Sequence, residues 1–238
     1  MQKKYLPILF SLIIAFSSFL LYPLLLSEFP DNGEVNREIW FIKSTTNETP
    51  YFILTDDVFT GNKMDVEWIQ HGKDNLTLDS GTQEWNFTTT DYFEGKKVKL
   101  FGKIITNGFQ FEEKLGFASA AENNEAPYLV ANSKGPQQIC TLLIPLNESI
   151  SLPEINVLEG KKNETCISIQ HDKSRDIFWS RFHDQKTELS KEVDQWIPKA
   201  LSFFLRTNES NNLLSMAFRN ASNLQRGDIT YFTSSNPV

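Results

Sequence analysis

Residues 37–71, REIWFIKSTTNETPYFILTDDVFTGNKMDVEWIQH, form the stretch that decides the fold. The stretch contains three runs of aromatic and β-branched residues, at 39–42, 51–54 and 66–69. Asn, Thr, Pro, Asp and Gly residues separate the runs, and these residue types favour turns. Aromatic and β-branched side chains suit a pleated sheet, and no helical period competes with them. The stretch therefore predicts three β-strands.

In the rest of the chain, short strand-like runs likewise alternate with turn residues. Further strand-like runs lie at 85–90, 96–106, 109–117, 139–146, 166–171, 177–179, 201–205, 213–218 and 229–232. The pair Asn107–Gly108 predicts a hairpin between the second and third of these runs. Only residues 189–205 offer a helical pattern. Many short strands with turn signals between them favour an all-β fold, an antiparallel β-sandwich, over a parallel α/β fold.

The order of features also resembles a known family. Arg37 opens one strand, the next ends in Asp56 and Asp57, and a third reads Val-x-Trp-x-x-His up to His71. Runs at 128–131, 138–145 and 175–178, with a Gly-Asp-Ile turn at 227–229, follow in the same order. This series is similar to the C-terminal β-sandwich of the heparinase II/III-like polysaccharide lyases. The resemblance implies such a sandwich over residues 37–238.

The resemblance covers the part of that family that does not catalyse. In the family, an α/α toroid before the sandwich carries the residues for β-elimination, and some members hold zinc with two His and one Asp. Only 36 residues precede Arg37, most of them apolar, and they contain no zinc-binding pattern. The sequence likewise lacks a Gly-x-Ser-x-Gly elbow, a phosphate-binding Gly loop and a Cys-x-x-Cys pair. We therefore expect no catalytic residue, no metal and no cofactor.

The N-terminus predicts contact with a membrane. Lys3 and Lys4 precede residues 5–26, a run of 22 residues without charge. As a helix this run would span about 33 Å, enough for a bilayer core of about 30 Å. Basic residues before it and acidic residues after it place the body outside the cytoplasm. We expect a signal anchor or signal peptide at 1–27, a linker at 28–36 and the sandwich domain at 37–238. The protein is then a single-pass protein of the cell membrane, or is secreted if the signal is cleaved.

Sequons support the exported location. Seven Asn-x-Ser/Thr sites occur, more than expected by chance, and they predict a glycoprotein. The alternative is that a surface rich in Asn and Thr contains sequons by composition alone, and that these are not glycosylated. The predicted glycosylation sites are Asn47, Asn75, Asn86, Asn147, Asn163, Asn208 and Asn220.

The two cysteines, Cys140 and Cys166, each lie in a strand-like run. One disulfide between them suits an oxidising compartment. Two separate buried thiols are the alternative, and the sequence does not decide between the two.

The net charge limits the ligands. The formal charge is −7, and without Lys3 and Lys4 there remain 21 basic against 30 acidic residues, a charge of −9. Nucleic acids and heparin-like polyanions require clustered Lys and Arg, so neither is an expected main ligand.

Three residues are candidates for contact with a glycan. Trp85 and Tyr92 could stack on a sugar ring, although aromatic residues in strands are more often part of the core. His71 ends a strand, where sites often form, and capping the next turn is its structural alternative. Asp56 and Asp57 could hold calcium through their carboxylates, but we interpret them as turn residues.

These observations predict a non-catalytic, membrane-anchored module that contacts surface polysaccharide or a partner protein. Fold likeness alone does not carry function, so two alternatives remain. The chain could be the sandwich subunit of a split polysaccharide lyase whose toroid is on another chain. It could also be a structural glycoprotein of the cell envelope.

Overall fold

The computed structural model describes residues 33–43, 49–72, 74–90, 95–117, 125–147, 150–182, 192 and 195–234. From Glu34 on, these residues belong to one compact unit. The predicted anchor at 5–26 lies outside the described residues. No helix within the described part of the chain is long and apolar enough to cross a membrane.

The described residues form strands and no helix, so the predicted all-β class is confirmed. Every strand pairs with its neighbours in antiparallel fashion. The strands are β1 (Glu34–Ile42), β2 (Tyr51–Phe59), β3 (Asp65–His71), β4 (Asn75–Asp79), β5 (Glu84–Thr90), β6 (Lys97–Ile104), β7 (Gln110–Gly116), β8 (Ala126–Lys134), β9 (Gln137–Asn147), β10 (Glu154–Lys161), β11 (Glu164–Gln170), β12 (Ser174–Arg181), β13 (Trp196–Lys199), β14 (Ser202–Asn208), β15 (Leu213–Arg219), β16 (Asn223–Arg226) and β17 (Ile229–Thr233).

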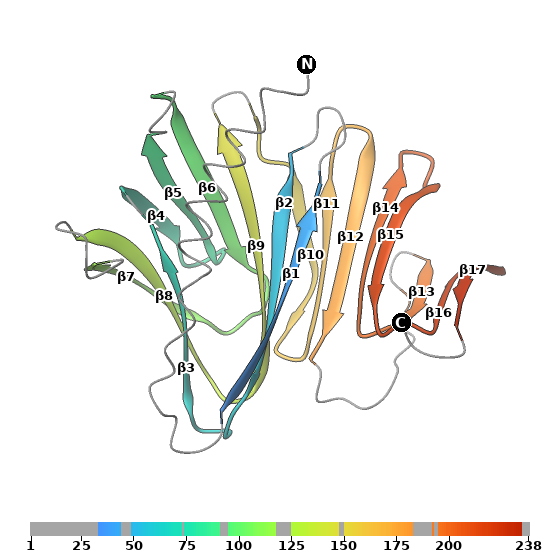
Figure 1. Cartoon of the computed structure of the whole chain (residues 1–238), viewed down its shortest axis with the longest axis horizontal. Helices are drawn as coiled ribbons and strands as arrows, with labels where there is room; N and C mark the ends of the chain where they lie inside the picture. The colour runs from blue at the N-terminus through green and yellow to red at the C-terminus, as the bar shows by residue number, and fades with distance from the viewer. Residues whose placement is uncertain are drawn as a thin grey trace. The chain divides into compact units, whose positions relative to one another are not determined.

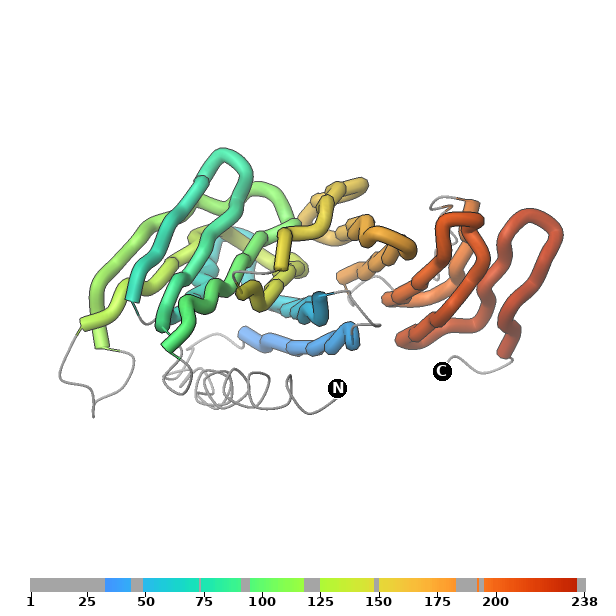
Figure 2. The backbone as a smooth tube through the Cα atoms, turned by 90° about the horizontal axis from the view of Figure 1, so that it is seen from above, coloured from blue at the N-terminus to red at the C-terminus, as the bar shows by residue number. Residues whose placement is uncertain are grey.

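The strands make four sheets that follow one another across the molecule (Figure 1). A six-stranded sheet has the order β1-β2-β9-β6-β5-β4, and a five-stranded sheet has the order β10-β11-β12-β14-β15. Two three-stranded sheets, β3-β8-β7 and β13-β16-β17, complete the unit. Seen from above, the two larger sheets meet in the middle, and the strands from β14 to β17 lie at one end (Figure 2).

The five-stranded sheet is buried on both faces. Its first face packs on the six-stranded sheet through an apolar core that includes Ile53, Leu142 and Phe178. Its second face packs on the β13-β16-β17 sheet through Trp179, Trp196 and other apolar side chains. The central strands β11, β12 and β14 are therefore buried along almost their whole length, instead of alternating. Stacked antiparallel sheets of this kind agree with the predicted sandwich-like packing.

The β3-β8-β7 sheet packs on the other face of the six-stranded sheet. The rings of Trp68 in β3 and Trp85 in β5 lie 5.5 Å apart at this contact. Trp85 also lies over Gly102 of β6, where an added Cβ would come within 2.2 Å of the ring. Glycine at position 102 is thus required by the close approach of the indole.

Three details differ from the sequence-based predictions. The prediction of a hairpin at Asn107–Gly108 is wrong, because β6 pairs with β5 and β9, whereas β7 pairs with β8. The amides of Ile105 and Asn107 bond instead to the carbonyls of Cys140 and Gly160, which carries the chain away from β6. The predicted helix at 189–205 is also wrong in its described part, which forms strand β13 with alternating burial and the buried strand β14. Residues 34–36 are not linker, because their backbone already pairs with β2.

We predict that Gly102→Ala destabilises the protein by about 1 to 3 kcal/mol, since the buried Trp85 ring must shift to admit the methyl group. Urea unfolding followed by tryptophan fluorescence measures the change. Gly61→Ala is the matched control, because a Cβ there meets only ordinary contacts at 3.6 Å. Equal stability of the two variants would contradict the packing described above.

Candidate functional site

The predicted glycan-contacting residues do not come together. Trp85 has 0% of its surface exposed and packs on Trp68, so it cannot stack on a sugar. That prediction is wrong because alternation along β5 points Trp85 into the contact between sheets. Tyr92 lies outside the described residues. His71 ends β3 and is partly exposed, as a binding residue must be.

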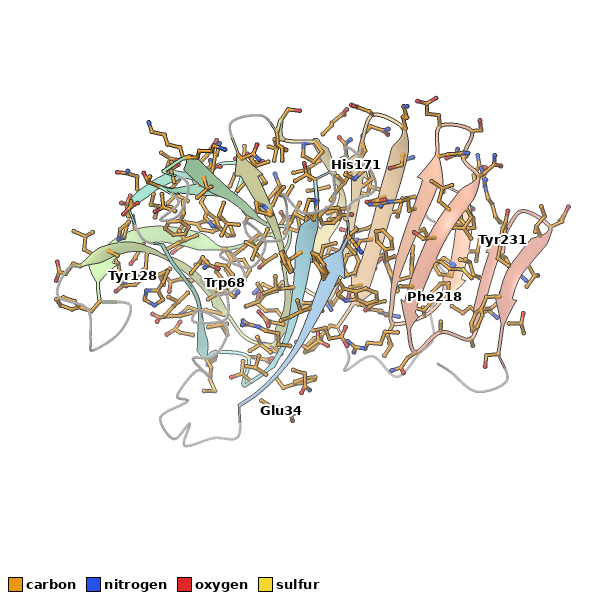
Figure 3. All side chains as sticks on the ribbon, turned by 45° about the horizontal axis from the view of Figure 1, so that its top comes forward. Glu34, Trp68, Tyr128, His171, Phe218 and Tyr231 are labelled. Atoms are coloured by element: carbon orange, nitrogen blue, oxygen red, sulfur yellow. The ribbon has the colours of Figure 1, made fainter. Side chains whose placement is uncertain are left out.

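His71 lies on the open face of the β3-β8-β7 sheet. Its ring is 5.1 Å from the ring of Tyr128 in β8, at an angle of 31°. Strand register places His71 opposite Tyr128, and Tyr128 opposite Lys114 of β7. Tyr128 sits towards the outer end of the molecule, and Trp68 lies further in (Figure 3). Gly116 leaves room for the Tyr128 ring, since a Cβ there would be 3.0 Å from it.

Polar side chains surround this aromatic pair. Residues two apart in a strand share a face, so the next two rows of the same face follow from the register. We name this surface the His71 face, and it consists of His71, Tyr128, Lys114, Ile69, Val130, Glu112, Glu67, Asn132 and Gln110. Glu112 and Lys114 form an exposed ion pair of 3.2 Å, and this contact raises the pKa of Lys114. The His71 face thus offers the ring of Tyr128 beside hydrogen-bonding groups that include both positive and negative charges.

Tyr128 could not be singled out from the sequence. The run at 128–131 is apolar throughout, and β8 is buried on both sides at most positions. Only the pairing of β8 with β3 and β7 shows that Tyr128 faces outward beside His71.

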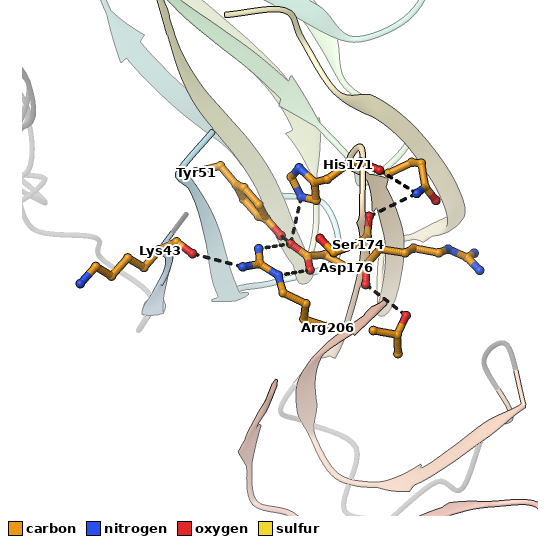
Figure 4. A network of polar contacts seen from close by, with 9 residues as sticks. Lys43, Tyr51, His171, Ser174, Asp176 and Arg206 are labelled. Carbon is orange, nitrogen blue, oxygen red and sulfur yellow. Dashed lines mark hydrogen bonds and ion pairs between the residues drawn. The ribbon is translucent and has the colours of Figure 1, made fainter. Parts of the chain in front are cut away.

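A second group of polar residues is buried between the two large sheets (Figure 4). Asp176 of β12 receives two hydrogen bonds of 2.6 Å from Arg206 of β14, its direct partner in the register. Tyr51 of β2 donates a hydrogen bond of 2.6 Å to the same carboxylate, and His171 Nε2 lies 3.1 Å from it. Arg206 also donates to the carbonyl oxygen of Lys43. We name Asp176, Arg206, Tyr51 and His171 the Asp176 cluster.

The Asp176 cluster is a structural tie and not a catalytic centre. Asp176 is 1% exposed, and each of the three other side chains is buried too. Burial raises the pKa of Asp176, but hydrogen bonds from Arg206, His171 and Tyr51 outweigh it and hold the pKa below its ordinary value. A carboxylate so engaged has little capacity left to accept a proton from a substrate. The cluster instead joins β2 of one sheet to β12 and β14 of the other.

A second polar tie lies four residues further along β12. Gln138 of β9 donates to Asp57 and Ser180, each at 3.0 Å, and accepts from Thr165. Ser180 is also 2.8 Å from Ser202. Along one face of β12, therefore, polar Asp176, apolar Phe178 and polar Ser180 alternate between the sheets.

The interpretation of Asp56 and Asp57 as turn residues is wrong. Both are buried in the middle of β2. Asp56 is bound by Arg37 through hydrogen bonds of 2.5 and 2.9 Å, and Asp57 by Gln138. Within the described ranges, no group of His, Cys, Asp and Glu residues is placed to hold a metal ion.

The predicted disulfide is not formed. Cys140 and Cys166 are both buried thiols in the structure. Cys140 belongs to the core between the large sheets, whereas Cys166 belongs to the core shared with the β13-β16-β17 sheet. Thr165 faces Cys140 and is its hydrogen-bond partner, so the next residue of β11 points to the opposite face. The sequence could not decide this, because it does not show which side of β11 each residue faces.

The sequons differ in accessibility. Asn75, Asn163 and Asn220 are exposed, and Asn86, Asn147 and Asn208 are partly buried. Asn47 lies outside the described residues. No protein-family model matches the chain, and comparison with curated protein sequences also finds no match.

We predict that Asp176→Asn lowers the free energy of unfolding by about 3 to 5 kcal/mol, because it leaves the charge of Arg206 buried without its partner. Chemical denaturation at pH 7 measures this loss. Asp65→Asn is the matched control, since its ion pair with Lys134 is exposed and contributes less than about 1 kcal/mol. Similar losses in both variants would contradict the role of the Asp176 cluster.

The pH dependence follows from the lowered pKa of Asp176. A carboxylate whose pKa is lower in the folded state than in the unfolded state stabilises the fold at pH values above the unfolded pKa, which is 3.8 for Asp. This stabilisation disappears as the pH falls through the folded pKa. The stability difference between wild type and Asp176→Asn should therefore be constant above about pH 5 and shrink in stronger acid. Unfolding titrations between pH 2 and 7 test this, and a difference that grows in acid would contradict it.

We expect both cysteines to react with a maleimide only after unfolding. Burial raises the pKa of the Cys140 thiol to about 12, so its reactive thiolate is scarce at neutral pH. Mass spectrometry after labelling with and without denaturant counts the thiols. Labelling of neither residue in denaturant without reductant would show a disulfide and contradict the structure.

Proposed function

We propose that this chain is a non-catalytic module outside the cytoplasm, held at the membrane by residues 5–26, whose His71 face contacts a surface polysaccharide. The observation that carries it is the partly exposed Tyr128 beside His71 on the open face of an antiparallel sheet.

The composition of the His71 face suits a sugar. A pyranose has an apolar C–H face and hydroxyl groups at its rim, so it needs a ring to lie on and hydrogen-bonding groups beside that ring. Tyr128 supplies the ring, and the His71 ring lies beside it on the same face. Asn132, Gln110 and Glu112 supply amide and carboxylate groups in the following rows.

Charge favours a neutral or weakly charged polysaccharide. Within the His71 face, Lys114 is paired with Glu112, and Glu67 adds a further negative charge. The body as a whole is acidic. A dense polyanion would be repelled by such a surface, because it requires clustered basic residues.

We predict that Tyr128→Ala weakens binding to a glycan array by about tenfold, which corresponds to about 1.4 kcal/mol of lost contact. The full chain in detergent is the sample, and circular dichroism verifies the fold of each variant. Tyr231→Ala is the matched control, since Tyr231 is a partly exposed tyrosine on the distant strand β17. Equal binding by both variants, or binding to no glycan by the wild type, would overturn the proposal.

A further inference from the structure

The five-stranded sheet has an open edge at β15. β15 pairs with β14 on one side, and no described strand pairs with its other side. Leu214 is 56% exposed and Met216 is 40% exposed. An edge strand presents unpaired N–H and C=O groups, which can pair with a strand of another molecule.

β15 lacks the protection that most other sheet edges of the described chain possess. Charged side chains interrupt β1, β3, β7 and β10, and β13 contains a proline. β4 and β17 are short, with five residues each. In β15, by contrast, residues 213–218 read LLSMAF and carry no charge. Exposed, uncharged and apolar edges of this length are sites of unwanted pairing.

Two sequons stand at the two ends of this edge. Asn208 is the last residue of β14, at the turn that leads into β15, and Asn220 follows the last residue of β15. Asn220 is exposed and Asn208 is partly exposed. The side-chain oxygen of Asn208 accepts a hydrogen bond of 2.9 Å from the amide of Asn212. That bond engages the oxygen and not Nδ2, the atom to which a glycan is attached.

We propose that N-linked glycans on Asn208 and Asn220 shield the open edge of β15 from pairing with β15 of a second copy. The proposal rests on the location outside the cytoplasm that is part of the proposed function, and on the sequons predicted from the sequence. In the modification, Nδ2 forms a bond to the anomeric carbon of an oligosaccharide carried on a lipid diphosphate. The lipid diphosphate leaves and Nδ2 loses one proton. Large hydrated groups then stand at both ends of the strand.

A second copy is the partner that the edge fits best. Antiparallel pairing about a twofold axis at Met216 would set Leu214 opposite Phe218 and Ser215 opposite Ala217. No like charges meet in this arrangement, although the body carries a strong negative charge overall. Two copies without glycans at these sites could therefore pair their β15 strands, so that the two five-stranded sheets form one continuous sheet.

The test compares three variants of the full chain, made in a host that attaches N-glycans and purified in detergent. The first is Asn208→Gln with Asn220→Gln, and the matched control is Asn75→Gln with Asn163→Gln, which removes two exposed sequons elsewhere. The third adds Met216→Lys to the first. Mass spectrometry measures the occupancy of each site, and sedimentation velocity measures self-association.

We expect occupied sites at Asn208 and Asn220 in the wild type. The first variant should form dimers or larger species at concentrations where the wild type and the control do not, and Met216→Lys should restore the wild-type behaviour. Unoccupied sites in the wild type would overturn the proposal, as would an unassociated first variant. Association that Met216→Lys does not reverse would also overturn it. Failure of polysaccharide binding at Tyr128 is a separate result, because that assay concerns the β3-β8-β7 sheet.

Discussion

The joining of the two large sheets depends on the buried ion pair between Asp176 and Arg206 of the five-stranded sheet and on the hydrogen bond that Tyr51 of the facing sheet donates to it. Both charges lie between apolar layers, where an unpaired charge would cost more than a typical single contact contributes. The pair is supported by Tyr51 from the facing sheet and by His171 from the turn before β12. Because Tyr51 belongs to the facing sheet, the carboxylate of Asp176 receives its full set of hydrogen bonds only when the two sheets are docked in one register.

The same requirement explains the distribution of polar residues along β12. Its Asp176 and Ser180 take part in the two ties, and Phe178 fills the core between them. Successive sheets can then stack on both faces of the five-stranded sheet, with the β13-β16-β17 sheet on one side. At the opposite end of the stack, the β3-β8-β7 sheet covers the six-stranded sheet and leaves its own outer face open. Stacking thus produces a surface with Tyr128 and His71 side by side.

Much of the strand content could be predicted from the sequence, because it depends on local composition. The runs at 39–42, 51–54 and 66–69 lie within β1, β2 and β3. Which face a residue occupies depends on distant pairing, and there the predictions were wrong. Trp85 points inward because Trp68 of β3 packs on it. Cys140 and Cys166 belong to different cores because Cys166 points to the opposite face of β11 from Thr165, which faces Cys140. Asp56 and Asp57 are typical turn residues, but Arg37 and Gln138 pair with them inside a sheet.

Hydrogen exchange of the full chain, measured by mass spectrometry with and without soluble polysaccharides, tests the central claim most directly. The panel should include neutral polymers and uronic-acid polymers. At least one neutral or weakly charged polymer should slow exchange in peptides from β3, β7 and β8 and leave β15 and β17 unchanged. Slower exchange confined to other strands, or no change with any polymer, would contradict a binding role for the His71 face.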